Sequence, residues 1–312
     1  YSQVYTIGRL VFAFVGNRLT VLQVGQDLPE GARTLWSRPV SSEQQLGLGA
    51  IWAGNRGAGL FAMPASAGLP VAVSLEAVCL LGDRKLTALD PISGEVLWVR
   101  DDMPAGSGLF GDQRHLVVAS TDGSQAEVLD VLDGRTIARC TVPPANQRML
   151  TLGTQVVVWE AVQNSAMLGL YDPLTGKYLW QRKYQSRPKA WPISPQEVAV
   201  CDEQGRLEIV ALPSGRLLCA AQLDSPPNLR DLVVQKALGQ YMVIVNHGFA
   251  AAASAMGNTI PVEGMVYGID ASRGMLRWSV ELKQCGFRPG GPTDIPLLVF
   301  ELSSMVRHGN TF

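Results

Sequence analysis

The sequence lacks an excess of charge of either sign and lacks long apolar runs. Its 26 Lys and Arg residues stand against 27 Asp and Glu residues, so the formal net charge is −1. A balanced charge of this kind is not the electrostatic footprint of a protein that binds nucleic acid or an anionic membrane surface. No apolar stretch reaches the roughly 18 residues that a membrane-spanning helix needs. We therefore expect neither nucleic acid as a partner nor a direct membrane span.

Histidine and cysteine are also scarce, and neither is grouped for metal or redox chemistry. The three histidines, His115, His247 and His308, are not at metal-ligand spacing. The five cysteines include no Cys-x-x-Cys motif and no vicinal pair, and three of them lie in apolar runs. This pattern favours buried free thiols over a disulfide framework, with one bridge between repeats left open. The cysteines are Cys79, Cys140, Cys201, Cys219 and Cys285.

The common catalytic signatures are missing as well. There is no Gly-x-Ser-x-Gly nucleophile elbow, and the glycine-rich run at 54–59 lacks the Lys-Ser/Thr pair and the following helix of a phosphate-binding loop. Asp112 and Asp202 lie at strand edges, where a role in a turn or cap explains a carboxylate better than catalysis does. The sequence therefore predicts no catalytic residue, no cofactor and no metal site.

What the sequence does contain is a repeated hairpin, clearest at residues 86–98. The residues on both sides of its turn alternate with period 2, as in half-buried β-strands. In the turn, the Asp90 carboxylate can accept a hydrogen bond from a backbone N–H two residues on, and Pro91 presets φ. Gly94 can take the positive φ that returns the chain to the second strand. These features predict a five-residue hairpin loop.

The hairpin recurs along the chain. Its turn glycines lie at positions 94, 134, 176, 215 and 274, so the steps are 40, 42, 39 and 59 residues, and a degenerate earlier copy ends at Trp36. Several short strands repeated every 40 residues or so are typical of a β-propeller. The residues assigned to this structural repeat are Trp36, Asp90, Gly94, Trp98, Asp130, Gly134, Asp172, Gly176, Trp180, Gly215, Asp270, Gly274 and Trp278.

One position of each repeat, four residues after the turn glycine, is predicted to pack between neighbouring blades. It is occupied by Trp98, Ala138, Trp180, Cys219 and Trp278. A large ring at a fixed strand position fills the gap to the next sheet. At the alanine and the cysteine, either neighbouring side chains fill that gap or the interface packs less well.

We interpret residues 1–312 as a single β-propeller domain with two insertions, at 41–69 and 246–264. Long loops of this kind are either functional or disordered, and the second insertion could also form a short helix. The candidate partner-contact residues are Trp52, Arg56, Phe61, Phe249 and Met256. The repeats span about 5–40, 70–103, 106–144, 147–184, 189–224 and 229–282, with a partial seventh at 288–312.

The partial seventh repeat leaves ring closure open. An apolar strand is predicted at 295–302, but the next turn glycine would be expected near position 314. Either the N-terminal strands complete this blade, because an open strand edge invites wrong pairing, or the segment belongs to a longer polypeptide. We favour the second alternative.

The phrases LTALDPISGEVLW, LGLYDPLTGKYLW and VYGIDASRGMLRW resemble the repeats of the pyrroloquinoline-quinone-type (PQQ-like) propeller family over residues 5–282. That family includes quinoprotein alcohol dehydrogenases and the outer-membrane assembly lipoprotein BamB. The long insertions are also similar to those of large multi-module planctomycete-type proteins. The resemblance implies an all-β, WD40-like propeller of four-stranded antiparallel blades, with seven or eight blades in a complete ring, and favours the cell envelope or periplasm.

The resemblance does not bring the family's chemistry with it. The dehydrogenases hold their quinone with a vicinal cysteine pair, a stacking Trp and a Ca²⁺ ion bound by Glu and Asn, beside a catalytic Asp. This sequence has no Cys-Cys pair. We therefore expect a non-enzymatic protein-interaction scaffold within a larger protein or an envelope-associated assembly. The alternatives are a quinoprotein-type dehydrogenase or other small-ligand propeller, and a BamB-like factor that binds a β-barrel partner by strand addition.

Overall fold

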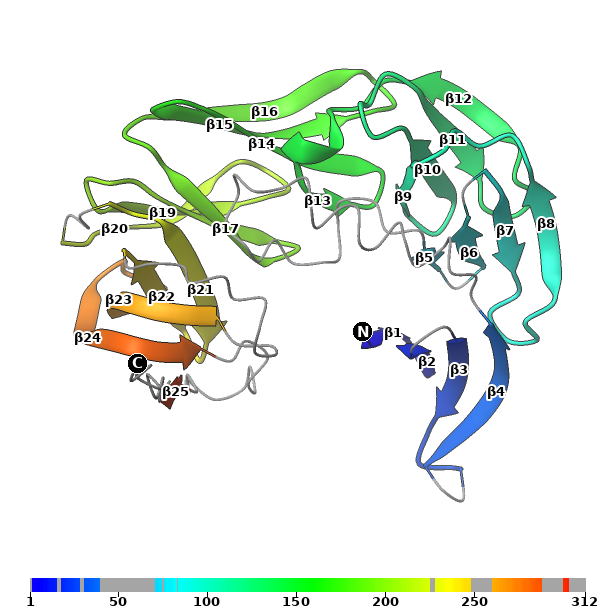
Figure 1. Ribbon diagram of the computed structural model, residues 1–312, viewed down its shortest axis with the longest axis horizontal. Helices are drawn as coiled ribbons and strands as arrows, with labels where there is room; N and C mark the ends of the chain where they lie inside the picture. The colour runs from blue at the N-terminus through cyan, green and yellow to red at the C-terminus, as the bar shows by residue number, and fades with distance from the viewer. Residues whose placement is uncertain are drawn as a thin grey trace, which may run out of the picture. The chain divides into compact units, whose positions relative to one another are not determined.

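A computed structural model shows a chain built from β-strands (Figure 1); among the residues that it describes, a short 3₁₀ helix, η1 (Ala145–Gln147), interrupts them. The structure describes residues 2–15, 18–28, 31–39, 71–74, 76–82, 84–224, 228–247, 260–287 and 300–302. Within these ranges the strands form five four-stranded sheets and one five-stranded sheet. The fold is the predicted all-β propeller architecture, in which each repeat is one antiparallel blade.

The chain divides into two compact units, Tyr1–Glu160 with Leu168–Arg182, and Ala161–Met167 with Lys183–Phe312. Three sheets belong to the first unit. Their strands are β1 (Ser2–Ile7), β2 (Leu10–Val15), β3 (Arg18–Val24) and β4 (Ala32–Pro39); β5 (Val71–Val73), β6 (Val78–Leu81), β7 (Leu86–Leu89) and β8 (Val96–Arg100); and β9 (Gly108–Gly111), β10 (His115–Ala119), β11 (Ala126–Asp130) and β12 (Thr136–Cys140).

The fourth sheet contributes residues to both units, and two sheets belong to the second. The fourth consists of β13 (Arg148–Leu152), β14 (Gln155–Val162), β15 (Ser165–Asp172) and β16 (Lys177–Tyr184). The others are β17 (Lys189–Ser194), β18 (Glu197–Cys201), β19 (Arg206–Ala211) and β20 (Leu217–Gln222), then β21 (Asp231–Ala237), β22 (Gln240–Asn246), β23 (Ile260–Asp270), β24 (Leu276–Phe287) and β25 (Phe300–Leu302).

Within each sheet the burial pattern follows the position of the strand. Second strands such as β6, β10, β18 and β22 are buried along nearly their whole length, because a blade packs against a neighbour on each side and therefore needs a nearly continuous apolar run. Fourth strands such as β12 and β16 alternate instead: every second residue of each is exposed. The period-2 pattern that reveals the repeats in the sequence is thus the pattern of the outer strands.

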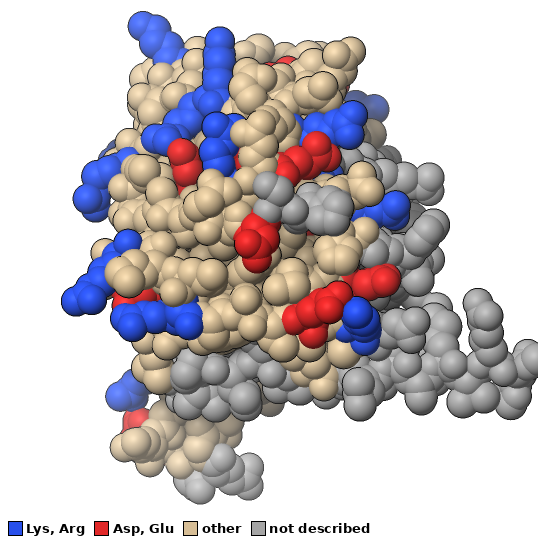
Figure 2. Space-filling model, turned by 90° about the vertical axis from the view of Figure 1, so that its left-hand side faces the viewer, with Lys and Arg blue, Asp and Glu red and all other residues tan. Residues whose placement is uncertain are grey.

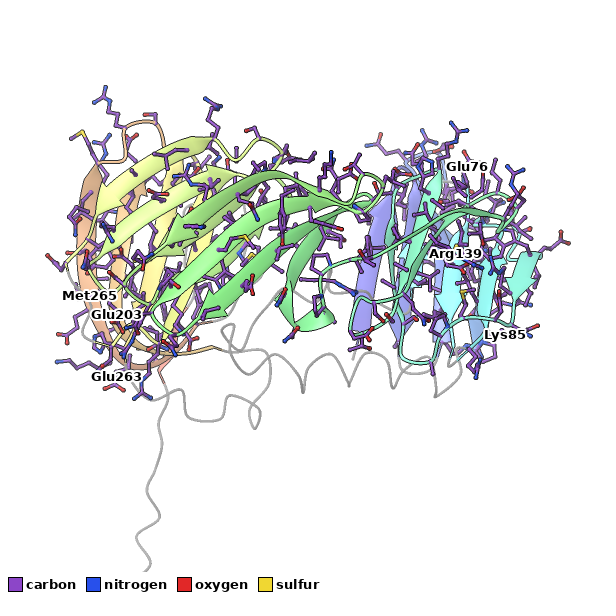
Figure 3. The ribbon with its side chains drawn as sticks, turned by 90° about the horizontal axis from the view of Figure 1, so that it is seen from above. Glu76, Lys85, Arg139, Glu203, Glu263 and Met265 are labelled. Atoms are coloured by element: carbon purple, nitrogen blue, oxygen red, sulfur yellow. The ribbon has the colours of Figure 1, made fainter. Side chains whose placement is uncertain are left out.

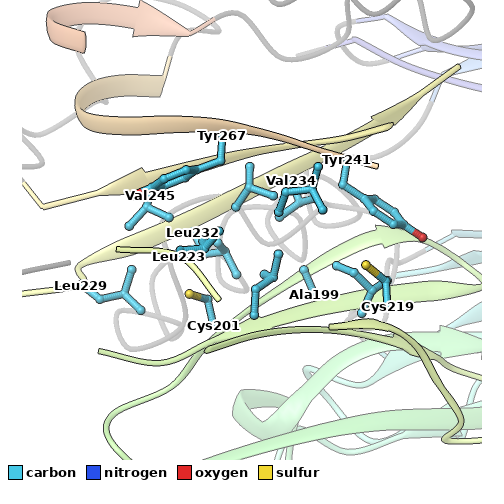
Figure 4. Packing of buried hydrophobic residues seen from close by; sticks show 14 residues of the cluster. Ala199, Cys201, Cys219, Leu223, Leu229, Leu232, Val234, Tyr241, Val245 and Tyr267 are labelled. Atoms are coloured by element: carbon cyan, nitrogen blue, oxygen red, sulfur yellow. The ribbon is translucent and has the colours of Figure 1, made fainter. Parts of the chain in front are cut away.

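Three clusters of buried side chains show how consecutive blades pack. In the first unit, Leu19 and Val21 pack with Leu80 and Leu89 of the next sheet, and Leu81 and Leu86 pack with Leu116 and Leu129 of the one after. In the second unit, residues of β18–β20 pack against β21–β23 (Figure 4). The members of this last cluster labelled in the figure are Ala199, Cys201, Cys219, Leu223, Leu229, Leu232, Val234, Tyr241, Val245 and Tyr267.

Two boundaries differ from those predicted. The second insertion was expected to reach residue 264, but residues 260–264 belong to β23, where Gly264 pairs with Asn246 and Val262 pairs with Cys285. The described part of the predicted strand at 295–302 is β25, which pairs with the end of β24 through Phe287 and Phe300. It adds a fifth strand to an existing sheet rather than beginning a seventh one, because β23 and β24 extend beyond the usual blade length and offer a free edge.

Among the described residues there is no helix long and apolar enough to cross a membrane.

Candidate interaction surface

The hairpin turns between the third and fourth strands carry most of the predicted repeat residues. In the turn between β7 and β8, the Asp90 carboxylate accepts hydrogen bonds from the backbone N–H groups of Ile92, at 2.8 Å, and Ser93, at 2.7 Å. The N–H of Gly94 donates to the Asp90 carbonyl at 2.9 Å, and φ of Gly94 is +72°. The local chemistry predicted for this turn is confirmed.

The same backbone geometry recurs in the four later turns. The N–H of each turn glycine donates to the carbonyl four residues earlier over 2.8–2.9 Å, and each glycine has φ between +66° and +70°. The turn of 211–215 lacks the aspartate, since Ala211 stands in its place, and it also lacks the N–H that the carboxylate would bind, since Pro213 occupies the third position. The other turn glycines are Gly134, Gly176, Gly215 and Gly274.

Two tryptophans lock these turns to the preceding sheet. The indole N–H of Trp36 in β4 donates to the Pro91 carbonyl at 3.0 Å, and that of Trp98 in β8 donates to the Val131 carbonyl at 2.8 Å. Each ring also covers the turn glycine: a Cβ on Gly94 would lie 2.7 Å from the Trp36 ring, and a Cβ on Gly134 would lie 2.7 Å from the Trp98 ring. The glycines are therefore needed for space as well as for positive φ.

In two repeats an alanine or a cysteine stands at the tryptophan position, and other contacts are found at the junction with the next sheet. Beyond Ala138, the hydroxyl of Tyr171 donates to the Thr141 carbonyl at 3.2 Å, and the Tyr171 ring meets the Tyr178 ring edge to face at 5.3 Å. At the next replaced position, the sulfur of Cys219 would lie 3.4 Å from a Cβ on Gly274. The Tyr171 hydrogen bond favours the alternative in which neighbouring side chains occupy the junction near Ala138, which stays a prediction.

Trp180 lies in β16 and Trp278 in β24, at the predicted strand positions. The Trp278 ring covers Gly268 of its own sheet, and 40% of Trp278 is exposed. A role for Trp180 in packing against the next blade stays a prediction.

A charged network reinforces one junction in the first unit. The Arg100 guanidinium donates to the Gly134 carbonyl at 3.1 Å and to the Thr136 hydroxyl at 2.9 Å, and it pairs with Asp102 at 2.5 Å and Glu127 at 3.2 Å. The hydrogen bond from Arg100 lowers the pKa of the Asp102 carboxyl. This network ties β8 to the turn that the Trp98 ring also holds.

The isolated acids and the histidine considered in the sequence have turn roles. Asp112 accepts hydrogen bonds from the N–H groups of Arg114 and His115, and its carboxylate lies 3.4 Å from the His115 ring nitrogen. The buried Asp202 accepts from the N–H groups of Gln204 and Arg206 and forms an ion pair with the Arg206 side chain. Both carboxylates thus have the turn role that their positions at strand edges predict.

The cysteines and the potential metal ligands are dispersed. All five cysteines are free thiols, as expected, and burial raises the pKa of Cys79 and of Cys201 to about 12. No group of three or more His, Cys, Asp or Glu side chains converges in a way that could hold a metal ion within the part of the chain that the structure describes. The candidate partner-contact residues Trp52, Arg56, Phe61, Phe249 and Met256 lie outside the described residues.

The turns of the first unit lie at two opposite ends of its sheets. Glu76, in the connection between β5 and β6, lies at one end, and Lys85, between β6 and β7, lies at the other, with Arg139 of β12 in between (Figure 3). Since strands alternate in direction, the turns between third and fourth strands lie at the same end as Glu76.

The face in Figure 2 shows Lys and Arg side chains interspersed with Asp and Glu, with no extended region of one sign.

The family model described as "Outer membrane protein assembly factor BamB" matches residues 27–256 of the chain. Similar solved structures include BamB from Moraxella catarrhalis, with 14% identity, a TM-score of 0.41 and coverage of 90% of this chain and 75% of that one. A europium-containing methanol dehydrogenase has 11% identity, a TM-score of 0.47 and coverage of 91% and 73%. The computationally designed Ika8 protein has 13% identity, a TM-score of 0.49 and coverage of 91% and 78%. No curated protein matches the chain.

Proposed function

Since this chain belongs to the PQQ-like propeller family described as outer membrane protein assembly factor BamB, we propose that it is a non-catalytic scaffold that binds other proteins. Its place would be within a larger protein or an envelope-associated assembly, and the family description, which names an outer membrane assembly factor, supports the second of these. The observation that carries the proposal is the family match over residues 27–256, most of the described chain. A partner in this setting is another protein or another domain of the same polypeptide.

The chemistry of the repeats supports this proposal. The carboxylates of Asp90, Asp130, Asp172 and Asp270 accept backbone hydrogen bonds inside their turns, and Trp36 and Trp98 are occupied in holding neighbouring sheets together. Groups engaged in this way stabilise the blades, which is the structural role that a scaffold requires of them. What the blades offer to other molecules is a rigid surface of turns.

The alternative function is that of a quinoprotein-type dehydrogenase. It depends on side chains that could bind the quinone and its Ca²⁺ ion. Pyrroloquinoline quinone with Ca²⁺ needs several oxygen ligands at one place. Among the described residues no three acidic, cysteine or histidine side chains converge, and the sequence lacks the vicinal cysteine pair of the dehydrogenases; both observations favour the scaffold over this alternative. We derive no reaction step from it. Adding the quinone with Ca²⁺ to the protein tests the alternative directly: a stoichiometric change in the absorption spectrum would support it and would contradict the scaffold proposal.

Cross-linking in intact cells tests the scaffold function. The full-length protein, tagged and cross-linked in its own host, is purified under gentle conditions, and the cross-linked peptides are identified by mass spectrometry. We expect one or a few proteins in fixed stoichiometry, and saturable binding when the purified partner is added to the purified chain. Recovery of the bare protein alone would contradict the proposal.

A further inference from the structure

Three consecutive sheets, β5–β8, β9–β12 and β13–β16, each present one exposed apolar side chain of the first unit at the tip of the turn before the fourth strand. These are Ile92, 65% exposed, Leu132, 61% exposed, and Leu174, 48% exposed. We call these three residues the turn-tip row. In each turn the residue just before the tip is buried. The side chain at the tip points to solvent instead. The buried residues are Pro91, Val131 and Pro173.

The turn geometry does not require an apolar residue at the tip. Its backbone N–H donates to the turn aspartate, as in Leu132 to Asp130 at 3.0 Å, and any residue except proline could supply that group. The corresponding residues in the two turns of the second unit are Pro213 and Ser272, both exposed. Large apolar side chains at this position are therefore confined to three neighbouring turns of one unit.

Contacts between sheets hold each of the three turns against the sheet before it. Trp36 binds the turn of Ile92, and Trp98 binds the turn of Leu132. Tyr171, next to the third turn, binds the Thr141 carbonyl just after β12. Since these contacts already fix the turns, this chain would lose little conformational entropy when a partner covers the row.

The charges around the row are mostly negative. Seven carboxylates and three cationic side chains lie in the turns at this end of β5–β16. The backbone hydrogen bond from Ser93 lowers the pKa of the Asp90 carboxyl, which favours its ionised form. The acidic residues are Glu76, Asp90, Glu95, Asp112, Asp130, Asp133 and Asp172, and the basic ones are Arg114, Arg135 and Lys177.

We propose that the turn-tip row binds a protein segment in which large apolar side chains alternate with Lys or Arg. The apolar side chains would cover Ile92, Leu132 and Leu174, and the cations would meet the surrounding carboxylates. The proposal rests on the proposed scaffold function and specifies the surface and the chemistry of the partner.

Short synthetic peptides test it. Fluorescent nonapeptides of alternating Leu and Lys, Ser and Lys, or Leu and Glu are titrated into the purified protein at physiological salt, and binding is followed by anisotropy. The test variant is I92S/L132S/L174S. The matched control is L97S/I137S/L179S, which removes apolar side chains of 44%, 46% and 51% exposure from the outer strands of the same three sheets.

We expect the Leu-Lys peptide to bind wild type and control equally, and to bind the test variant at least tenfold more weakly, which corresponds to about 1.4 kcal/mol. The other two peptides should bind at least tenfold more weakly to wild type. Unchanged circular dichroism and thermal midpoint show that both variants fold. Equal weakening by both variants, or equal binding of the Leu-Glu or Ser-Lys peptide, would overturn the inference.

The same variants separate this inference from the scaffold proposal. If wild type captures a partner in cells and I92S/L132S/L174S captures it equally well, the binding surface lies elsewhere and the scaffold function stands. If wild type captures none, the scaffold function itself fails.

Discussion

At the scale of the residue, the junctions between blades depend on pairs of a tryptophan and a glycine. Gly134 combines a φ of +70° with an indole ring lying where a side chain would begin. Either demand alone favours glycine, and the two together exclude every other residue without movement of Trp98. The hydrogen bond from the indole to the Val131 carbonyl fixes the ring in that position.

Replacing Gly134 with alanine should therefore cost more than conformational strain alone. Alanine at positive φ costs about 1–2 kcal/mol, and displacement of the Trp98 ring should raise the loss of unfolding free energy to about 3 kcal/mol. The matched control is Gly239→Ala, since Gly239 has φ +74° and a Cβ there would meet no described atom within 4 Å. Urea unfolding measures both; equal losses would show that the ring contact adds nothing.

Replacing Trp98 with phenylalanine isolates the indole hydrogen bond. The change keeps a large ring over Gly134 but leaves the Val131 carbonyl without its donor, so we expect a loss of about 1 kcal/mol or more in unfolding free energy. Trp278→Phe is the control, because Trp278 is 40% exposed and its indole makes no hydrogen bond to the described residues. A loss as large in the control would contradict this account of the junction.

At the scale of the element, the repeated structure is a hairpin whose turn is closed by a backbone hydrogen bond and by one aspartate carboxylate. The pairing of the third and fourth strands shifts by one residue just before the turn in five hairpins, for example between Ala88 and Leu89. A bulge at this point, with glycine at positive φ, lets a five-residue loop close without splaying the strands. It also sends Trp98 to the face that meets the next sheet.

The turn carboxylates make stability depend on pH. The hydrogen bond from the Arg277 side chain lowers the pKa of Asp270, and the backbone N–H of Ser93 lowers that of Asp90. The pKa of each of these carboxyls in the folded protein lies below the unfolded value of about 3.9. Between these two pKa values the unfolded chain therefore binds more protons than the folded one. The contribution is present above that value and is lost as the pH falls through the lowered pKa of the folded state.

Asp270→Asn keeps a hydrogen-bond acceptor for the turn but removes the titrating group. The unfolding free energy of this variant should therefore fall less steeply with pH below about pH 4. Urea unfolding from pH 2 to 7 measures the slope. Arg277→Gln should reduce the same slope while leaving the turn hydrogen bonds from Ser272 and Arg273 in place. A slope unchanged in both variants would contradict the assignment.

At the scale of the whole molecule, the chain divides into two compact units while one sheet, β13–β16, contributes residues to both. Each unit has a buried thiol in its core: Cys79 in the first and Cys201 in the second. Cys140 is half-buried at the end of β12. These thiols report on the opening of each unit separately.

We expect an alkylating reagent at pH 8 to modify Cys140 first. Cys79 and Cys201 should react only after unfolding, because burial raises the pKa of each thiol to about 12 and shields it from the reagent. Since a sheet is shared by the units, both buried thiols should become reactive over the same range of urea. Mass spectrometry after a reagent pulse measures this; two separate transitions would show that the units unfold independently.

The sequence predicted the blades well because the repeat signal is local. Asp90, Gly94 and the strands on either side act on one another within a few residues, so their spacing reveals the hairpin wherever it recurs. The errors arose where no local signal existed. Residues 260–264 continue β23 because β22 and β24 offer partners there, and Phe300–Leu302 joins β24 for the same reason.

The sequence alone thus determined the strands, the five turns and the family resemblance, since each depends on backbone conformations that neighbouring residues dictate. Only the tertiary structure decided where the indole N–H groups bind, which are carbonyls 33 and 55 residues away, and that Tyr171 occupies the junction beyond Ala138. It also decided that Ile92, Leu132 and Leu174 are exposed while the residues before them are buried. Exposure depends on what the neighbouring sheet covers, and no pattern within a single hairpin contains that information.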